Sequence, residues 1–551
     1  MKKQIALAMA AFTLLGALGG CQPAGKAGGE DVDFSKAPSG EITVGSYDYM
    51  SYGRHMEAAA KRFMAKYPGT TVNVTTFSSM PEIKMTSSED GSMAMAAISM
   101  DDNAGAEADY LQALNTELMG GGGADVLAMD VLPYYKYADA GQLLDMSSFM
   151  ADDPGFDRRD YYETVLDAMQ YNDGQYILPL DFTFNYLTYS PELLSAAQQE
   201  ALAGKKLLTY DDLLAIGAMD FTPQEDLSVL TDSKTGFFHN MFRANLSRFI
   251  DLSKKTCDFT SGAFEALLTD TVNRDAAGYL VPEPESFDFD SNGTFVTGGA
   301  ISAMLLGGGG RSYFASNMNL MLMNHFNTNE DGEQMFLTPG GANTDEHEIA
   351  GLLANNEGKA EVDYMKAFGI NANTKNARLA WEFIKFLLTE DEQLSIQVVG
   401  TPVHRAAAEE DVKQEITRQI RMSGGATSIR MPDSGGFVMS GSVDAGSDGG
   451  NGGENALTPG FSISGGPINM EEAEEPPLVR AVLNEKQTEV YNRYMSQLTA
   501  FLADLQTHTV EDSALSDIVH VEADRFFAGE ISAAEAAQAI QNKISLILSE
   551  Q

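Results

Sequence analysis

Three neighbouring segments decide the fold: Glu41-Ile42-Thr43-Val44-Gly45, residues 52–67, and Thr71-Val72-Asn73-Val74-Thr75. The first and third alternate apolar and polar residues, which predicts two strands. Between them, apolar residues recur at helical spacing, and Pro68-Gly69 ends that helix. A strand, a helix and a second strand with short connections predict a parallel pair joined by a right-handed crossover.

The alternation of helices and strands continues along the chain. A helix predicted over residues 106–119 precedes Gly120–Gly123 and an apolar strand at 124–130. Later strands are expected at 176–180 and 186–189, and a strongly amphipathic helix at 381–388. This order predicts a doubly wound α/β fold, in which ligands bind at the carboxyl ends of the strands.

The charge balance excludes some classes of partner. The 551 residues contain 36 Lys and Arg against 79 Asp and Glu, which gives a formal net charge of −43. Such a surface repels phosphate groups, which argues against binding to nucleic acid or to a bare anionic membrane. The acidity serves solubility or a cationic ligand. Two cysteines cannot form a disulfide framework, and Cys257 is expected to be a small buried apolar residue.

The first residues are typical of an export signal. Met1-Lys2-Lys3 precedes an apolar run that ends at Leu18, which is too short to span a bilayer as a mature helix. The segment Leu18-Gly19-Gly20-Cys21 resembles the lipobox of bacterial lipoproteins. The resemblance implies a signal peptide at 1–20, acylation of the Cys21 sulfur, and a flexible tether at 21–40. The protein would then lie on the extracellular face of the bacterial cytoplasmic membrane, held by a lipid anchor.

Passages spread over the chain resemble the extracellular solute-binding proteins of bacterial ATP-binding-cassette importers, the broad family that includes maltose-binding protein. The resemblance covers residues 41–84, 106–420 and 478–551. Its motifs are Tyr67-Pro68-Gly69-Thr70-Thr71-Val72, Gly123-Ala124-Asp125-Val126, Tyr186 to Leu194, Phe295 to Met304, Gly369 to Asn376, Ala380 to Leu387, and Gly400-Thr401-Pro402-Val403.

The resemblance implies a two-lobed, periplasmic-binding-protein-like (type II) fold with a hinge between the lobes. Lobe one would comprise residues 41–185 and 367–405, and lobe two residues 186–366 and 406–551. The glycine-rich stretch 423–466 is interpreted as a flexible insertion in lobe two. The implied protein is a monomer without cofactor or enzymatic activity. It captures a solute by closure and delivers it to a membrane permease, with a sugar or oligosaccharide as the first expectation and a cationic solute as the second.

Candidate ligand-binding residues are polar or aromatic side chains at strand ends or near the predicted crossings between lobes. A solvated turn, a helix cap or a surface salt pair remains the alternative explanation for several of them. The candidates are Tyr47, Asp48, Tyr49, Asp130, Asp181, Asn185, Arg311 and Tyr313.

The sequence gives weaker support to other sites and functions. Trp381, the only tryptophan, has core spacing, so only tyrosines and phenylalanines remain to stack on a sugar. The segment 288–293 begins like a calcium loop, but its twelfth position is Gly299 rather than a bidentate Glu, so no metal is expected. A carboxylate-dependent glycoside hydrolase and a surface adhesion protein that uses the glycine-rich stretch are the rival functions.

Overall fold

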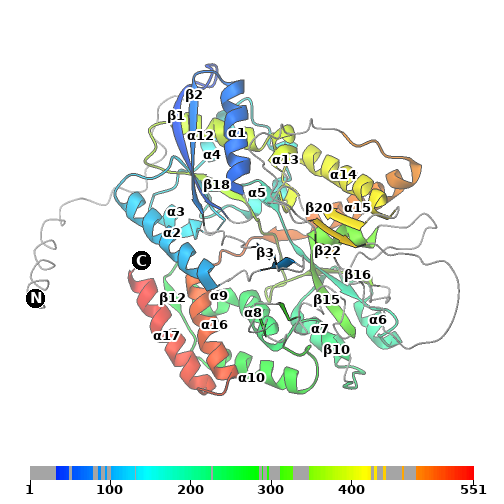
Figure 1. Ribbon diagram of the computed structural model, residues 1–551. Coiled ribbons are helices and arrows are strands. Elements are labelled where there is room, and N and C mark those ends of the chain that lie inside the picture. The colour runs from blue at the N-terminus through cyan, green and yellow to red at the C-terminus, as the bar shows by residue number, and fades with distance from the viewer. Residues whose placement is uncertain are drawn as a thin grey trace, which may run out of the picture.

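The computed structural model of the protein describes residues 33–48, 52–78, 85–87, 93–95, 101–130, 132–224, 227–283, 288–289, 295–296, 311–326, 347–396, 398–423, 427–430, 438–441, 462–463 and 480–550. Two five-stranded sheets, each covered by helices, form two lobes, one above the other in Figure 1. This arrangement confirms the predicted two-lobed α/β fold.

Lobe one is built on a mixed sheet. Its strands are, in spatial order, β2 (Thr70–Ser78), β1 (Gly40–Asp48), β5 (Val126–Ala128), β18 (Ala367–Ile370) and β6 (Leu178–Pro179). Strands β1, β2 and β5 are parallel, whereas β18 is antiparallel to both β5 and β6. The predicted strand, helix and strand unit is therefore present. Its turn uses Gly69, whose φ of +119° lies in the left-handed region that favours glycine.

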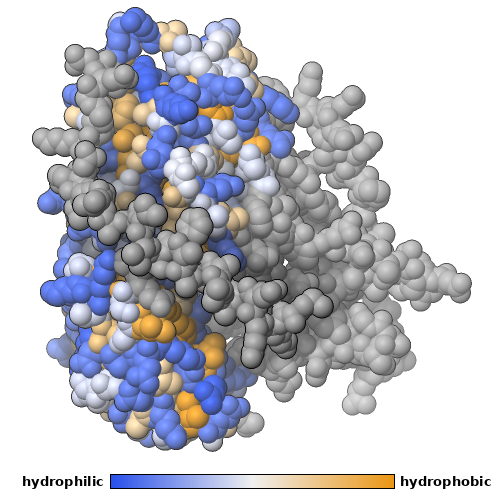
Figure 2. Space-filling model, turned by 90° about the vertical axis from the view of Figure 1, so that its left-hand side faces the viewer, coloured by the Kyte–Doolittle hydropathy of each residue, from blue (hydrophilic) through white to orange (hydrophobic). Residues whose placement is uncertain are grey.

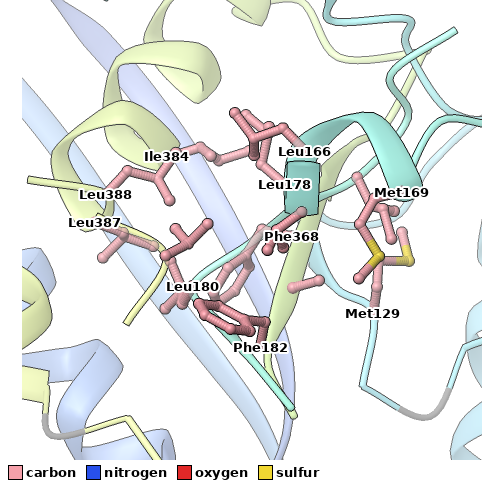
Figure 3. Packing of buried hydrophobic residues seen from close by; sticks show 14 of the residues in the cluster. Met129, Leu166, Met169, Leu178, Leu180, Phe182, Phe368, Ile384, Leu387 and Leu388 are labelled. Carbon is pink, nitrogen blue, oxygen red and sulfur yellow. The ribbon is translucent and has the colours of Figure 1, made fainter. Parts of the chain in front are cut away.

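Helices cover this sheet with their apolar faces. They are α1 (Tyr52–Lys66), α2 (Asp101–Met119), α3 (Tyr134–Asp139), α4 (Ser147–Asp152), α5 (Glu163–Ala168), α12 (Ala377–Leu387) and α13 (Glu390–Ile396). Figure 3 shows the end of α12 with Ile384 and Leu387 directed toward Leu180 and Phe368. Trp381 is fully buried and its indole N–H donates to Asp153 Oδ2 at 2.8 Å, as expected for a core residue.

Lobe two has a second mixed sheet. Its strands are, in spatial order, β10 (Leu227–Leu230), β15 (Arg311–Met318), β8 (Asn185–Tyr189), β16 (Glu348–Leu353) and β9 (Leu207–Leu208). Strand β8 is antiparallel to both of its neighbours, and the two outer pairs are parallel. The carboxyl ends of β10, β15, β16 and β9 therefore lie at one edge of the sheet, together with the start of β8.

The helices of lobe two enclose two apolar clusters. They are α6 (Ala196–Leu202), α7 (Tyr210–Gly217), α8 (Lys234–Ala244), α9 (Leu246–Phe249), α10 (Ala263–Ala276), α16 (Ser513–Phe527) and α17 (Ala533–Glu550). One cluster lies against the sheet, and the other joins α8 and α10 to α16 and α17. Ser532 and Glu535 form a capping box at the start of α17.

Two helices and several small sheets complete the described chain. Helices α14 (Arg405–Ser423) and α15 (Glu485–Leu502) contribute Val412, Ile416, Tyr494 and Leu498 to the apolar cluster that contains the lobe-one core and also Tyr186 and Leu352 of lobe two. Within the glycine-rich stretch, which we predicted to be a flexible insertion, the described residues form a three-stranded sheet. Its strands are β20 (Thr427–Arg430), β21 (Val438–Gly441) and β22 (Ser462–Ile463).

Short strand pairs occur at five further places. They are β3 (Met85–Ser87) with β4 (Met93–Met95), β11 (Ile250–Asp251) with β12 (Thr256–Cys257), β13 (Asp288–Phe289) with β14 (Phe295–Val296), β17 (Ala360–Glu361) with β23 (Leu505–Thr507), and β7 (Asp181–Phe182) with β19 (Thr401–Pro402). The last pair lies in the hinge.

The chain enters lobe one through an aromatic contact. The Phe34 ring lies edge-on to Phe149, with 6.3 Å between ring centroids, and the Arg378 guanidinium lies 4.5 Å from its centroid. Residues 1–32 lie outside the described residues, and so does the predicted lipidation site Cys21. On the side drawn in Figure 2, hydrophilic residues cover most of the described surface, and hydrophobic residues form small patches in both halves.

Two histidines stack between helices of lobe two. The rings of His239 on α8 and His520 on α16 lie 3.6 Å apart, centroid to centroid. Burial lowers the pKa of both imidazoles, and His239 lowers the pKa of His520 further, to about 4. Asp524, Glu283 and Glu511 act in the opposite direction on His239. The folded protein therefore prefers both rings neutral.

This pair should make lobe two sensitive to acid. Because the folded-state pKa is depressed, the unfolded chain takes up protons first as the pH falls below about 6.5, and stability falls until the pH reaches the folded pKa. Between pH 7 and pH 4.5, the wild type should lose about 1 kcal/mol more of its free energy of unfolding than His520→Gln, a value reduced for partial exposure. Urea unfolding at both pH values measures this difference, and equal losses would contradict the assignment.

Candidate functional site

The carboxyl edges of both sheets adjoin the hinge. We use this name for residues 180–184, 362–366 and 399–403, which are joined to one another by the pairing of β7 with β19 and by the bridge between Thr183 and Asp363. On the lobe-one side, Met129, directly after β5, donates its N–H to the Ala367 carbonyl. On the lobe-two side, Asn319, directly after β15, donates its side-chain amide to Thr401 Oγ1 at 2.9 Å. Side chains at both edges can therefore reach one region.

Asp181 holds the three hinge segments together. Its Oδ1 accepts hydrogen bonds from the backbone N–H groups of Met365 at 2.9 Å and Lys366 at 3.0 Å, and its Oδ2 accepts one from Gly400 N–H at 2.9 Å. The side chain is fully buried. Burial raises its pKa to about 6, against the effect of the three donors. Asp181 was predicted to contact a ligand, but in this arrangement its oxygens are occupied by the hinge backbone.

A hollow of about 170 Å³ opens at the lobe-two side of the hinge. We call it the hinge hollow. Polar and aromatic side chains from the hinge, from the carboxyl edge of the lobe-two sheet and from α8 line it: Thr183, Asn185, Tyr210, Asn240, Arg243, Asn355, Glu361, Asp363 and Tyr364. Mixed aromatic rings, amides and charges at a sheet edge suit a small polar ligand.

Acidic groups outnumber the cation in this region. The Arg243 guanidinium pairs with Asp363 at 2.6 Å and approaches Glu511 at 3.4 Å. Burial acts to lower the pKa of Arg243, but the carboxylates of Asp363, Glu361 and Glu511 raise it above its ordinary value. One guanidinium therefore faces three carboxylates, which leaves this part of the hollow negative.

A further carboxylate stands behind the wall of the hollow. Asp232 Oδ1 accepts hydrogen bonds from Asn240 Nδ2 at 2.7 Å and from the Tyr210 hydroxyl at 3.3 Å. Burial raises the pKa of Asp232. The two lining side chains are thus held in position by an acid.

The lobe-one edge carries a buried ion pair. Lys366, whose side chain is 1% exposed, pairs with Asp130 Oδ2. Burial raises the pKa of Asp130, and Lys366 partly offsets this rise. Asp130 Oδ1 and the Tyr134 hydroxyl are buried and have no hydrogen-bond partner among the described residues. Lobe one thus offers an acceptor and a hydroxyl near the hinge.

The structure brings some of the predicted residues to this region. Asn185 lines the hinge hollow and Asp130 lies at the lobe-one edge. Asp48 ends β1, whose partner β5 ends at the same edge, so its backbone position agrees with the prediction. The side chains of Tyr47 and Asp48 are not described, and Tyr49 lies outside the described residues.

Arg311 and Tyr313 lie elsewhere. Arg311 begins β15, and the hollow adjoins the other end of that strand at Met318. Tyr313 is buried in the lobe-two core, where its ring packs edge-on against Phe221 at 5.7 Å. Arg311 was expected to reach a ligand or the facing lobe because it follows four glycines. In the structure, however, β15 is parallel to β10 and its carboxyl end lies at the hinge, whereas Arg311 is at its start.

Several lining residues were not anticipated from the sequence. Arg243 and Asn240 come from α8, a helix without a ligand-binding motif. The residues next to them in the sequence give no sign that these two side chains line a hollow. Asp363 and Tyr364 did have a signal, because they lie four and three positions before residue 367, where the chain was predicted to return to lobe one. Polar residues before that point could have been included as candidates.

Comparison with known families decides the class of protein. A family profile described as bacterial extracellular solute-binding protein matches residues 58–418, more than half of the chain. The chain belongs to the bacterial extracellular solute-binding proteins. This membership agrees with the motif resemblance, and it identifies an exported protein that binds a solute.

Solved structures resemble this solute-binding protein at low sequence identity. They include a family 1 protein from Alicyclobacillus acidocaldarius (TM-score 0.47, 13% identity, 93% of this chain and 99% of that chain), an oligogalacturonide-binding protein from Yersinia enterocolitica (0.48, 12%, 93% and 99%), and a maltose/maltodextrin-binding domain from Bdellovibrio bacteriovorus bound to maltotriose (0.45, 12%, 93% and 100%). No curated protein matches the chain.

The described part of the solute-binding protein contains neither a metal-binding cluster nor a helix that could span a membrane. Across the described ranges, no cluster of three or more His, Cys, Asp and Glu side chains could hold a metal ion. The segment 288–299, which begins like a calcium loop but lacks its final Glu, lies mostly outside the residues that the structure describes. No helix in the described part of the chain is long and apolar enough to cross a membrane.

The buried pair at the lobe-one edge gives a stability prediction. Lys366→Met should lower the free energy of unfolding by about 3 kcal/mol, because it leaves the Asp130 carboxylate buried without its cation. Adding Asp130→Asn to this variant should restore more than half of the loss. Urea unfolding at pH 7 measures both effects. If the double variant is no more stable than Lys366→Met, lost packing rather than unpaired charge causes the change.

Proposed function

We propose that this protein binds a sugar or oligosaccharide at the hinge hollow, closes its two lobes around it, and delivers it unchanged to a membrane permease. The observation that carries this proposal is the hollow itself, which combines the Tyr210 and Tyr364 rings with the amides of Asn185 and Asn240. Aromatic faces and amide groups are complementary to the apolar faces and hydroxyls of a sugar. Ligand contacts from both lobes would favour the closed state.

A cationic solute is the second candidate, and one observation favours it. Asp363, Glu361 and Glu511 share a single guanidinium, so a ligand with an ammonium group would offset the remaining negative charge. An amino sugar would satisfy both sets of groups.

The proposal extends to the attachment of the protein. Acylation of Cys21 would hold the exported protein at the membrane, which its acidic surface would not bind unaided. The chain from Cys21 to Phe34 would act as the tether to lobe one. Replacing Cys21 by Ser should release the protein from the membrane fraction of the host cell.

A ligand screen tests the function. Protein that lacks residues 1–21 should gain thermal stability with at least one sugar, oligosaccharide or polyamine, in proportion to RT ln(1 + [L]/Kd), and should leave that compound chemically intact. Peptides serve as an unrelated class. Turnover of a glycoside would favour the rival hydrolase, and a flat response across all sugars and amines would contradict the proposal.

Site variants test the place of binding. With the best compound from the screen, Asn185→Ala should raise Kd about tenfold or more, because the side chain lines the hollow. Asn356→Ala, an exposed neighbour outside the hollow, is the matched control and should leave Kd unchanged. Calorimetry measures both values. Equal Kd values for the two variants would show that the ligand does not bind in the hinge hollow.

The charge of the ligand is tested by Glu361→Gln. For a cationic ligand, Kd should rise about tenfold or more, whereas for a neutral sugar the amide retains hydrogen bonding and Kd should change less than about threefold. Glu357→Gln, an exposed carboxylate that pairs with Lys359, is the control.

A further inference from the structure

One acidic side chain of lobe two is bound by side chains of lobe one. Asp512 precedes α16 and caps it, because its Oδ1 accepts the Ala514 N–H at 3.1 Å. The residue is only 4% exposed. The helix that it caps belongs to lobe two, where Leu515 and Val519 pack into the cluster with α17.

The other oxygen of Asp512 meets two donors from α3 of lobe one. Asp512 Oδ2 accepts a hydrogen bond from the Tyr135 hydroxyl at 2.7 Å and pairs with Lys136 Nζ at 2.6 Å. The neighbours of these donors on α3, Tyr134 and Tyr137, are part of the lobe-one core. Each donor is therefore fixed to one lobe and the acceptor to the other.

An aromatic contact lies beside this polar one. The His508 ring, just before Asp512 in the chain, stacks on Tyr134 with 6.1 Å between centroids and lies 5.4 Å from Tyr364. None of these contacts requires an atom of a ligand. They join the segment 508–512 to lobe one and to the hinge.

Separation of the lobes would break the contacts of Asp512 Oδ2. In this structure the carboxylate has exchanged water for a hydroxyl and an ammonium group, and separation of α3 from α16 would leave Lys136 and Asp512 to be hydrated separately. A contact that exists in only one of two states shifts the population toward that state.

We propose that Asp512, Tyr135 and Lys136 form an interlobe latch that favours closure of the protein before any ligand is bound. By raising the fraction of molecules already in the binding-competent arrangement, the latch raises the apparent affinity for whatever solute the protein carries. Asp512 is thus a positioning residue for solute capture and does not itself contact the solute. The proposal is independent of the chemical class of the ligand.

The experiment measures the shape of the ligand-free protein. Small-angle scattering is recorded for protein without residues 1–21, for Asp512→Asn, for Lys136→Met and for Tyr135→Phe. Asparagine still caps a helix, so Asp512→Asn removes the charge of the latch while keeping α16. The matched control is Asp212→Asn, which removes an ion pair with Lys205 and preserves a helix-capping position inside lobe two.

We expect the three latch variants to have a larger radius of gyration than the wild type, as their closed-to-open ratio falls at least about tenfold, and Asp212→Asn to match the wild type. The proposal is overturned if all proteins scatter alike, or if the ligand-free wild type is already as extended as the variants. Should Asp512→Asn not fold, Lys136→Met decides, because this partly exposed side chain can be replaced without unfolding α16. Failure of the ligand screen leaves this measurement unaffected.

Discussion

The hydrogen bonds of one buried carboxylate connect the three hinge segments. Asp181 lies in the first hinge segment and accepts N–H groups from the other two, so the relative register of all three depends on one side chain. The approach is close: a Cβ on Gly400 would lie 2.8 Å from the Phe182 carbonyl oxygen, so only glycine fits there without a shift. The positions of Lys366, Tyr364 and Asp363 follow from this clamp, and with them one wall of the hinge hollow.

Three cations of this acidic protein lie where the lobes and the hinge meet. Lys366 neutralises Asp130 at the lobe-one edge, Arg243 joins α8 to the hinge at Asp363, and Lys136 reaches Asp512 across the lobes. Buried or half-buried acids gain most from such partners, because an unpaired carboxylate away from water is costly. The net charge of −43 is therefore mainly a property of the surface, and the hinge hollow retains a smaller share of it.

The sequence predicted the fold well because burial in strands and helices is periodic over consecutive residues. The alternation at 41–45 and 71–75 and the apolar stripe of α12 identified elements that the structure contains. The sheet order could be inferred only through the resemblance, since pairing between distant strands has no local signal. Composition alone also gave no sign that short segments within the glycine-rich stretch pair as strands.

The site was predicted less completely, for a geometric reason. Asp130 and Asn185 could be found because they stand at the ends of recognisable strands. Arg243 and His508 come from a helix and a connection far away in the chain, and only tertiary packing brings them to the hinge. Arg311 and Tyr313 were not predicted to lie in a strand, and the pairing that places them in β15, with its carboxyl end at the hinge, has no local signal in the sequence.

The contacts of Phe34 with lobe one determine where a force on the preceding chain would act. Phe34 is held between Phe149 and Arg378, both in lobe one, so tension on the preceding residues is transmitted to lobe one and not across the hinge. With the proposed anchor at Cys21, the force from the membrane would therefore act on lobe one, and the hinge would not carry it.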